Sequence, residues 1–421
     1  MKTDTIWYQE ALRVIHKACT PHGILASAQD VDNYQRIFCR DAVITGIAGL
    51  LADDERTITA FRASLLHLAE AQGSIGQIPS NIGQNESHTQ TVSYGGLAGR
   101  VDATTWWIIG AGIFLHNRTD SALQTALEPV VHRAFAALRA WEFNDKGLLY
   151  IPLSGNWADE YIVQGYTLYD QLLRLWAFRA AYTVWNHDAW KRDAERLADS
   201  IRINFRQHPS PEKRYHQSAY LRAIEKSSLL SIPHTEVPPS GHYWWCSFAP
   251  NGYDTRWDMA ANALALLLGL GTDEENIATN DFLHLLARTQ GNWLLPAFAP
   301  VIMPEDPEWR LLEENYVYRF KNHPHHFHNG GCWFVFMGWL ALGLTMQGFS
   351  ETAQILHTTM HTTLAAEATP YTFFEYVNPV TGISGGTPHL CFTAAGMLLA
   401  DYADSLRSGV DVPAQKLAIS V

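Results

Sequence analysis

The chain has 421 residues, 47% of them hydrophobic, and a formal net charge of −12 at neutral pH. This length and apolar content suffice for a large buried core, whereas the negative charge argues against nucleic acid or an anionic membrane surface as a partner. No apolar run approaches the length of a membrane span, and no basic segment followed by an apolar run opens the chain, so we expect neither a membrane helix nor a signal peptide.

Apolar residues recur at helical spacing in about twelve segments, and this pattern predicts an all-α protein. In a representative segment, Ser121 can cap a helix that then carries Leu123, Leu127, Val130 and Val131 on one face. Strand-like alternation is scarce, so we expect at most a short hairpin in the loops. The predicted helices cover residues 7–19, 41–51, 57–71, 102–116, 121–140, 166–186, 188–206, 257–270, 280–290, 330–346, 350–366 and 391–407.

The connections between these helices alternate between long and short. Helices joined by a short turn tend to lie antiparallel, so every long connection should emerge at the same end of the bundle. A closed ring of antiparallel pairs satisfies this pattern in a single domain that spans residues 1–421, with a C-terminal tail of about residues 408–421. Because loops this long seldom serve only as connectors, we expect a functional site where they meet. The long connections are residues 20–40, 72–101, 141–165, 207–256, 291–329 and 367–390.

The first candidate catalytic group stands at the end of one long connection. Asp102 begins a predicted helix and is followed closely by two adjacent tryptophans, Trp106 and Trp107. Capping of the helix would by itself account for an aspartate there. An acid beside aromatic faces at a loop-to-helix junction is also how a sugar-cleaving site holds a carboxylic acid of raised pKa next to a pyranose ring.

A second carboxylate lies in another long connection. Glu375 stands between Phe374 and Tyr376, just before an Asn-Pro turn. A glutamate satisfied by backbone donors is the structural alternative. Two loop-borne carboxylates at one end of a bundle are, however, what glycoside hydrolysis requires, since one protonates the leaving oxygen while the other activates water or attacks the anomeric carbon. Further residues in or beside the long connections, at the same end of the bundle, are candidates for sugar binding. They are Arg40, Asp41, Trp107, Trp157, Asp159, Asp170, His328 and Asn329.

Four motifs, in order along the chain, resemble those of one enzyme family. Residues 37–41 contain a Phe-x-Arg-Asp element, and residues 101–107 are similar to Asp-Ser-Gly-Leu-Trp-Trp. Residues 328–333 resemble Tyr-His-Asn-Gly-Gly-Ser-Trp-Pro, and residues 374–376 resemble Pro-Glu-Tyr. These are motifs of the alkaline/neutral invertases, which are glycoside hydrolases.

The resemblance implies a fold and an activity. It implies an (α/α)6 barrel of six inner and six outer helices, a layout shared with glycogen-debranching-type and trehalase-type hydrolases. It also implies that Asp102 is the general acid and Glu375 the second catalytic carboxylate of an inverting enzyme. The expected reaction is the cleavage of sucrose into glucose and fructose.

One loop departs from the invertase pattern and keeps alternatives open. The family carries Asp-Arg-Arg-Met-Gly-Ile-His-Gly-His-Pro-Leu-Glu where this chain has residues 159–170, which retain the Asp and a Gly but lack both Arg and both His. An α-glucosidase or another small-glycoside hydrolase, of the amylo-α-1,6-glucosidase or glucosylglycerate type, therefore stands as the alternative. A sugar-binding or epimerising protein on the same helical ring is the remaining one, although epimerases of this layout use histidine pairs and not carboxylates.

We expect no metal and no other cofactor. His323, His325, His326 and His328 form a cluster, but their spacing fits no common zinc pattern. The expected partner is a small oligosaccharide or glycoside, and a homo-oligomer is possible. The five cysteines are scattered without a CxxC pair, which favours reduced, buried thiols in a cytoplasmic protein.

Overall fold

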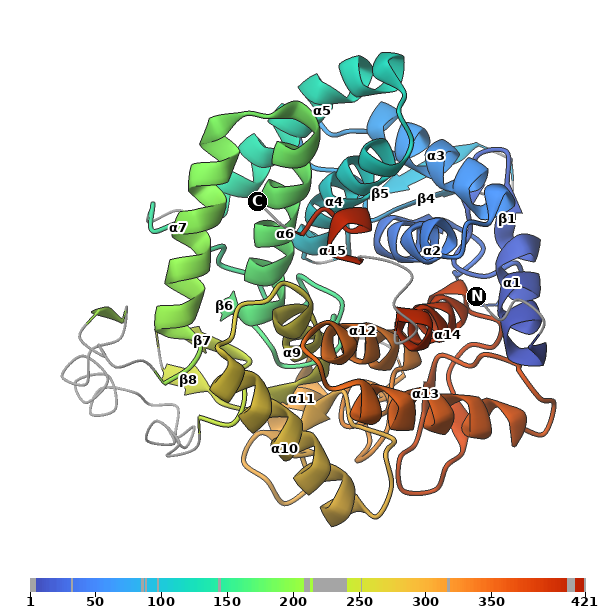
Figure 1. Ribbon diagram of the computed structural model, residues 1–421, viewed down its shortest axis with the longest axis vertical. Coiled ribbons are helices and arrows are strands. Elements are labelled where there is room, and N and C mark those ends of the chain that lie inside the picture. The colour runs from blue at the N-terminus through green and yellow to red at the C-terminus, as the bar shows by residue number, and fades with distance from the viewer. Residues whose placement is uncertain are drawn as a thin grey trace.

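The computed structural model describes residues 5–31, 33–84, 87, 89–96, 98–142, 145–207, 213–214, 241–250, 252–315, 319–406 and 413–419. Each predicted helix is present (Figure 1). Two short helices, α11 (Trp309–Glu314) and α15 (Pro413–Lys416), were not predicted. The predicted helices are α1 (Ile6–Ala18), α2 (Cys39–Leu51), α3 (Glu55–Glu70), α4 (Val101–Asn117), α5 (Ser121–Ala140), α6 (Leu168–Trp185), α7 (Asp188–Asn204), α9 (Met259–Leu267), α10 (Asp273–Gln290), α12 (Phe334–Met346), α13 (Ser350–Ala365) and α14 (Cys391–Leu406).

Alternate helices form a closed inner ring. Helix α2 packs against α4, α4 against α6, α6 against α9, α9 against α12, α12 against α14, and α14 back against α2. Most residues of these helices are buried, and α12 is buried at each residue from Phe334 to Leu344. A helix without a polar face has to be enclosed on all sides by other elements. Their composition therefore explains why they form the inner layer.

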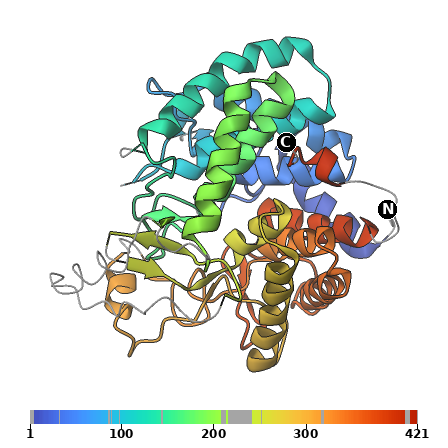
Figure 2. The same ribbon diagram turned by 60° about the vertical axis from the view of Figure 1, so that its left-hand side comes forward.

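The remaining long helices cover the ring. Helix α3 packs on α2, α5 on α4, α7 on α6, α13 on α12 and α1 on α14. Each has one apolar stripe; α7, for example, buries Trp190, Leu197 and Ile201 while its opposite face is charged. Figure 2, turned by 60° from Figure 1, shows α5 and α7 on the same outer side of the molecule. An amphipathic helix of this kind stabilises the ring by burying its apolar stripe, while its opposite face remains at the surface.

The long connections contain more β structure than the sequence indicated. Short antiparallel strands form two three-stranded and three two-stranded sheets among the described residues, so the expectation of at most one hairpin was wrong. Strands of two to four residues are too short to show alternation, and they form because buried backbone groups must be paired. The strands are β1 (Cys19–Thr20), β2 (Gly23–Ile24), β3 (Ile37–Phe38), β4 (Asn81–Gln84), β5 (Gln90–Ser93), β6 (Tyr166–Thr167), β7 (Ser247–Ala249), β8 (Gly252–Asp254), β9 (Trp257–Asp258), β10 (Phe298–Ala299), β11 (Tyr376–Val377) and β12 (Ser384–Gly385).

One helix is longer than predicted. Helix α10 begins at Asp273 and not at residue 280. Its start is a capping box, in which the Thr272 hydroxyl accepts from the Glu275 backbone N–H and the Glu275 carboxylate accepts from the Thr272 N–H. The acidic first turn looks like a polar loop by composition, yet negative charge at a helix N-terminus is stabilising.

Short strands lead directly into several inner helices and fix where their N-termini lie. β3 runs into α2, β6 into α6 and β9 into α9. Four successive inner helices carry an aspartate at this end: Asp41 and Asp170 in the first turn of α2 and α6, Asp102 in that of α4, and Asp258 at the N-cap of α9. The ring therefore gathers carboxylates at one of its ends, the N-terminal end of the inner helices, which is called the mouth below.

The C-terminal segment contacts the opposite end of the ring. The described part of the predicted tail is residues 413–419, while 407–412 and 420–421 lie outside the described residues. Asn117, the last residue of α4, donates to the Lys416 carbonyl over 2.7 Å, and the Trp176 indole donates to the Leu417 carbonyl over 2.8 Å. Leu417, Ala418 and Ile419 are buried there.

The cysteines agree with the expectation of free thiols. All five cysteines are free; four are buried, and Cys19 is partly exposed. Within the described ranges, no helix combines the length and the apolar character needed to cross a bilayer.

Candidate active site

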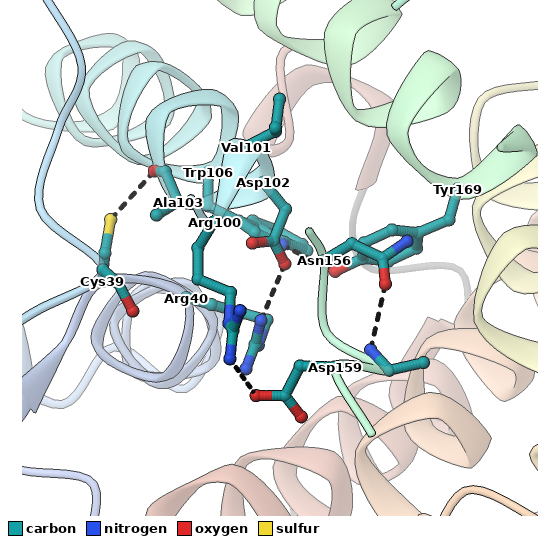
Figure 3. A network of polar contacts seen from close by, with 12 residues as sticks. Cys39, Arg40, Arg100, Val101, Asp102, Ala103, Trp106, Asn156, Asp159 and Tyr169 are labelled. Atoms are coloured by element: carbon teal, nitrogen blue, oxygen red, sulfur yellow. Dashed lines mark hydrogen bonds and ion pairs between the residues drawn. The ribbon is translucent and has the colours of Figure 1, made fainter. Parts of the chain in front are cut away.

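Asp102 lies at the floor of the mouth. It is fully buried, and Arg40 Nη1 from α2 donates to its Oδ2 over 2.7 Å, as Figure 3 shows. The capping interpretation does not apply, since α4 has no side-chain cap and Asp102 is already inside the helix. Burial raises the pKa of Asp102, and the positive charge of Arg40 opposes this rise only in part. Its Oδ1 makes no hydrogen bond with any described residue.

Glu375 is held between two donors. The Tyr34 hydroxyl donates to Oε1 over 2.6 Å, and the Thr387 backbone N–H donates to Oε2 over 3.2 Å. Burial raises the pKa of Glu375, while the Tyr34 hydrogen bond and the charge of Lys321 lower it. Gly386 has a φ of +79°, and a Cβ there would clash with Oε2, so only glycine lets this backbone approach the carboxylate.

A second ion pair lies beside the first. Arg100 Nη2 is 2.6 Å from Asp159 Oδ2, and Figure 3 shows this pair next to Arg40 and Asp102. Asp41 lines a small cavity together with Arg40 and Asp102. Burial raises the pKa of Asp41 to about 6. Three aspartates and two arginines, from the N-terminal ends of α2 and α4 and from the connection at residues 141–165, therefore meet at this point.

A third pair of opposite charges is formed by Glu160 and Lys321. Glu160 Oε1 lies 3.6 Å from Lys321 Nζ, and burial raises the pKa of Glu160 to about 7. The negative charge of Glu375 contributes to that rise, and the charge of Lys321 acts on both carboxylates. Glu160, Lys321 and Glu375 are therefore electrostatically coupled.

An aromatic wall stands beside the carboxylates. The Trp157 ring stacks on Phe298, with centroids 5.6 Å apart and planes at 6°, and contacts Phe336 at 4.4 Å. His328 meets the edge of Trp157 at 5.1 Å and stacks on Trp333 at 5.4 Å. Burial and the nearby positive charges lower the pKa of His328 well below its usual range, so this imidazole is neutral. Trp157 Nε1 and His328 Nδ1 make no hydrogen bond with the described residues.

Asp170 lies deeper in the ring. Its Oδ2 accepts from Thr167 Oγ1 over 2.6 Å and from Asn156 Nδ2 over 2.8 Å. Burial, with the negative charge of Asp102, raises the pKa of Asp170 to about 8. The raised pKa favours the protonated form of this carboxyl group, and its two hydrogen bonds give Asp170 partners within the protein.

Two residues expected to bind sugar have other partners. The Trp107 indole donates to the Leu65 carbonyl of α3 over 3.0 Å, so it packs between the inner and outer layers. Its neighbour Trp106 instead donates to the Tyr169 hydroxyl within the ring. The side-chain amide of Asn329 forms its hydrogen bonds with backbone groups. It accepts from the Ile302 N–H and donates to the carbonyls of residues 302 and 322. Trp107 and Asn329 therefore hold the scaffold.

A family model described as alkaline and neutral invertase matches residues 8–401. The chain belongs to this family of glycoside hydrolases. Among curated relatives, a probable alkaline/neutral invertase D from Arabidopsis thaliana is 25% identical over 76% of this chain and 66% of its own length. Cytosolic invertase 1 from Oryza sativa subsp. japonica is 25% identical over 76% of this chain and 63% of its own. The chain thus spans about two thirds of the length of these plant invertases.

Solved structures share the helical ring of this invertase family member. A GH63 mannosylglycerate hydrolase from Thermus thermophilus, in complex with Tris and D-glycerate, superposes with a TM-score of 0.64 at 13% identity, over 93% of this chain and 99% of that one. A bacterial glucoamylase complexed with acarbose gives 0.57 at 12% identity, over 96% and 56%. At such identities the likeness concerns the fold, which is that of the α/α-barrel glycosidases.

The loop that departs from the invertase pattern is packed inward. Tyr161, where the family has arginine, is fully buried, stacks on Phe298 at 4.4 Å and accepts a hydrogen bond from Arg256 over 3.2 Å. Glu160 takes the place of the other arginine and pairs with Lys321. Where the family pattern has two arginines, this chain has a buried aromatic contact and a neutralised ion pair.

Sequence reasoning missed two residues of this candidate site. Tyr34 lies 341 positions from Glu375, in a polar connection where no local pattern distinguishes it. Lys321 stands seven residues before His328, so the neighbouring motif at residues 328–333 could have drawn attention to it. Arg100 neutralises a carboxylate, that of Asp159. The contacts of Tyr34 and Lys321 depend on how distant connections fold over the mouth.

Proposed function

We propose that the protein is an inverting glycoside hydrolase that cleaves a small glycoside, with sucrose as the first candidate, into glucose and fructose. The observation that carries the proposal is the different surroundings of two buried carboxylates at one mouth. Burial raises the pKa of both carboxyl groups, but Asp102 has an oxygen without a partner among the described residues, whereas Glu375 is held by two hydrogen-bond donors. Environments that separate two carboxyl groups in this way assign an acid and a base.

We further propose that the ring is an (α/α)6 barrel in one domain. The inner layer would be α2, α4, α6, α9, α12 and α14, and the outer layer α1, α3, α5, α7, α10 and α13. The closed circle of inner contacts supports the inner count. In the outer layer, Phe282 of α10 packs on Trp257 at the start of α9, with ring centroids 5.2 Å apart. The active-site mouth would then lie at the N-terminal end of the inner helices.

In the proposed reaction, Asp102 gives a proton from Oδ1 to the glycosidic oxygen, so the leaving group departs as an alcohol. Glu375 is ionised and removes a proton from a water molecule, which attacks the anomeric carbon from the opposite face. The hydroxyl of Tyr34 and the N–H of Thr387 stabilise the charged Glu375. This route needs the two carboxyl groups roughly 6.5–9.5 Å apart, and it inverts the anomeric configuration.

The sugar nearest the cleaved bond would be bound by Arg40, Asp41 and Asp159, with Trp157 and His328 along the wall. Buried polar atoms nearly always have hydrogen-bond partners. Arg40 Nε, Trp157 Nε1 and His328 Nδ1 have none among the described residues. Sugar hydroxyls, which both donate and accept, would satisfy each of them.

The charge pattern favours a neutral substrate. Each of the three cations described at the mouth, Arg40, Arg100 and Lys321, already faces a carboxylate. A carboxylate on the aglycone would meet groups whose charge is largely neutralised, and burying it there is unfavourable. A neutral disaccharide such as sucrose therefore suits the site better than a glycoside of glyceric acid.

A second candidate is an α-glucosidase or another small-glycoside hydrolase, and the altered loop at residues 159–170 favours it. Losing charged donors costs about 1.5–3 kcal/mol per hydrogen bond, which is enough to change the preference between disaccharides. We also infer that the protein acts in the cytoplasm, in agreement with its free thiols and with the name of the rice relative.

The test is a panel of sucrose, trehalose, maltose, isomaltose and glucosylglycerate, assayed for released sugar with Asp102→Asn as the inactive control. We expect sucrose to be cleaved, and proton NMR of the first product to show the inverted anomer. Turnover of another member but not of sucrose would replace the substrate and keep the hydrolase. A retained anomer would contradict the roles of the carboxylates, and saturable binding without turnover would indicate a sugar-binding protein.

A further inference from the structure

We propose a zinc-binding site on the outer layer of the ring, formed by Glu128, His132 and His187. One ligand atom from each of these residues lies within 4.8 Å of the other two. The site is separate from the candidate active site, because α5 and α7 cover the ring from outside. It does not depend on the proposed function. Among the described residues, the histidines at 323–328 do not form such a group. The proposed site departs from the expectation that the protein binds no metal.

The backbone brings the three residues together. Glu128 and His132 are four residues apart on α5 and thus lie on one face, one turn from each other. His187 is the N-cap residue of α7. It follows Asn186, the C-cap residue of α6, which has a φ of +54° and is in the left-handed conformation. This conformation turns the chain sharply at the end of the helix. His187 therefore projects toward α5 from a short, defined turn.

Contacts with Trp190 hold the two imidazoles. The Trp190 ring centroid lies 4.6 Å from that of His187 and 5.0 Å from that of His132, and the two imidazoles are themselves 5.0 Å apart at 71°. His187 Nε2 is 2.7 Å from Glu128 Oε1. Tetrahedral zinc with bonds of about 2.0–2.1 Å needs ligand atoms roughly 3.3 Å apart. Small side-chain rotations would close the trio to that spacing.

The donor set suits zinc. Two neutral imidazoles and one carboxylate are ligands that Zn²⁺ takes in proteins, with a fourth position left for water. His132 and His187 also line a groove of about 850 Å³ between α5 and α7, which keeps that position open. An ion pair between His187 and Glu128 alone would leave the His132 imidazole with ring contacts only. A half-exposed pair of that kind also contributes little stability, whereas a bound ion would tie α5 to α7.

The experiment uses the full chain stripped of metal with EDTA. Zn²⁺ is then added, and bound metal is counted after dialysis, alongside thermal unfolding. We expect one tightly held Zn²⁺ per chain and a rise in Tm of about 3 °C at saturation. His132→Ala and His187→Ala should each lose the ion and the rise in Tm. His132→Gln repeats the test with less change in side-chain volume.

His16→Ala is the matched control. His16 Nε2 lies 2.9 Å from Asp54 Oδ2, so it forms a similar histidine–carboxylate pair but, among the described residues, with no third ligand. The His16→Ala variant should still bind the ion and still show the rise in Tm. Circular dichroism checks that every variant is folded. The proposal is overturned if the unaltered chain holds no zinc, or if its zinc persists in the His132 and His187 variants. None of these outcomes bears on glycoside cleavage, which is measured separately.

Discussion

Replacement of Tyr34 by phenylalanine removes one hydrogen bond from Glu375 and keeps the aromatic ring. The Tyr34 hydroxyl donates to Glu375 Oε1 over 2.6 Å. Burial and the charge of Glu375 raise the pKa of Tyr34 well above its usual value, so the hydroxyl stays a donor throughout the working pH range. A hydrogen bond to a charged group contributes about 1.5–3 kcal/mol, and one pKa unit corresponds to about 1.36 kcal/mol. We therefore expect the pKa of Glu375 to rise by about 1–2 units in Tyr34→Phe.

The sign of the effect follows from the role of Glu375 as base. The base must be ionised, and losing the donor favours its protonated form, so the acidic limb of the kcat/KM profile should move to higher pH. The shift should equal the pKa change, about 1–2 pH units. On the plateau above both limbs the activity should change much less. The basic limb, which depends on the proton of Asp102, should stay in place.

The assay is kcat/KM from about pH 4 to pH 9 on the best substrate of the panel. Tyr94→Phe is the matched control, because the Tyr94 hydroxyl donates over 2.8 Å to a neutral carbonyl, that of Ala71. This variant should keep both limbs of the parent profile. An acidic limb that does not move in Tyr34→Phe, or that moves equally in the control, would refute the assignment of Glu375 as the base.

Three further predictions concern the carboxylates of the mouth. Asp102→Asn keeps the shape but removes the proton donor, so hydrolysis should fall about 10²–10⁴-fold in a folded protein; near-normal turnover would remove Asp102 from the mechanism. Asp159→Ala should lower kcat/KM with little change in Tm, because a sugar contact is lost at a partly exposed ion pair; a ligand complex with Asp159 remote from the sugar would end that assignment. Asp170→Asn should reduce the pH dependence of the unfolding free energy. The folded protein holds a proton on Asp170 up to a pKa of about 8, whereas the unfolded chain releases it near pH 4, so the parent loses up to about 1.4 kcal/mol per pH unit between these values. Urea unfolding at pH 5.5 and pH 8 should show the variant gaining relative to the parent at the higher pH, and an equal difference at both pH values would contradict the cause.

The sequence by itself determined where the inner and outer helices lie. Helical periodicity and caps depend on neighbours within a few residues, so they can be recognised without a fold. The all-apolar composition of segments such as α12, and the single stripe of segments such as α7, reflect the layer each occupies. The alternation of long and short connections likewise places the polar connections at one end, where Asp41, Asp102 and Asp170 are found.

The tertiary structure alone decided which of these side chains face the mouth and what each one touches. Trp106 and Trp107 are adjacent in sequence, yet one donates within the ring and the other toward α3. The motif around Asn329 suggests a sugar ligand, but the side-chain amide forms hydrogen bonds with neighbouring backbone groups. Tyr34 reaches Glu375 across 341 positions. Such partners depend on the packing of distant connections. The side chains of a helix point in all directions around its axis, and only the surrounding layers determine which of them are buried and what they contact.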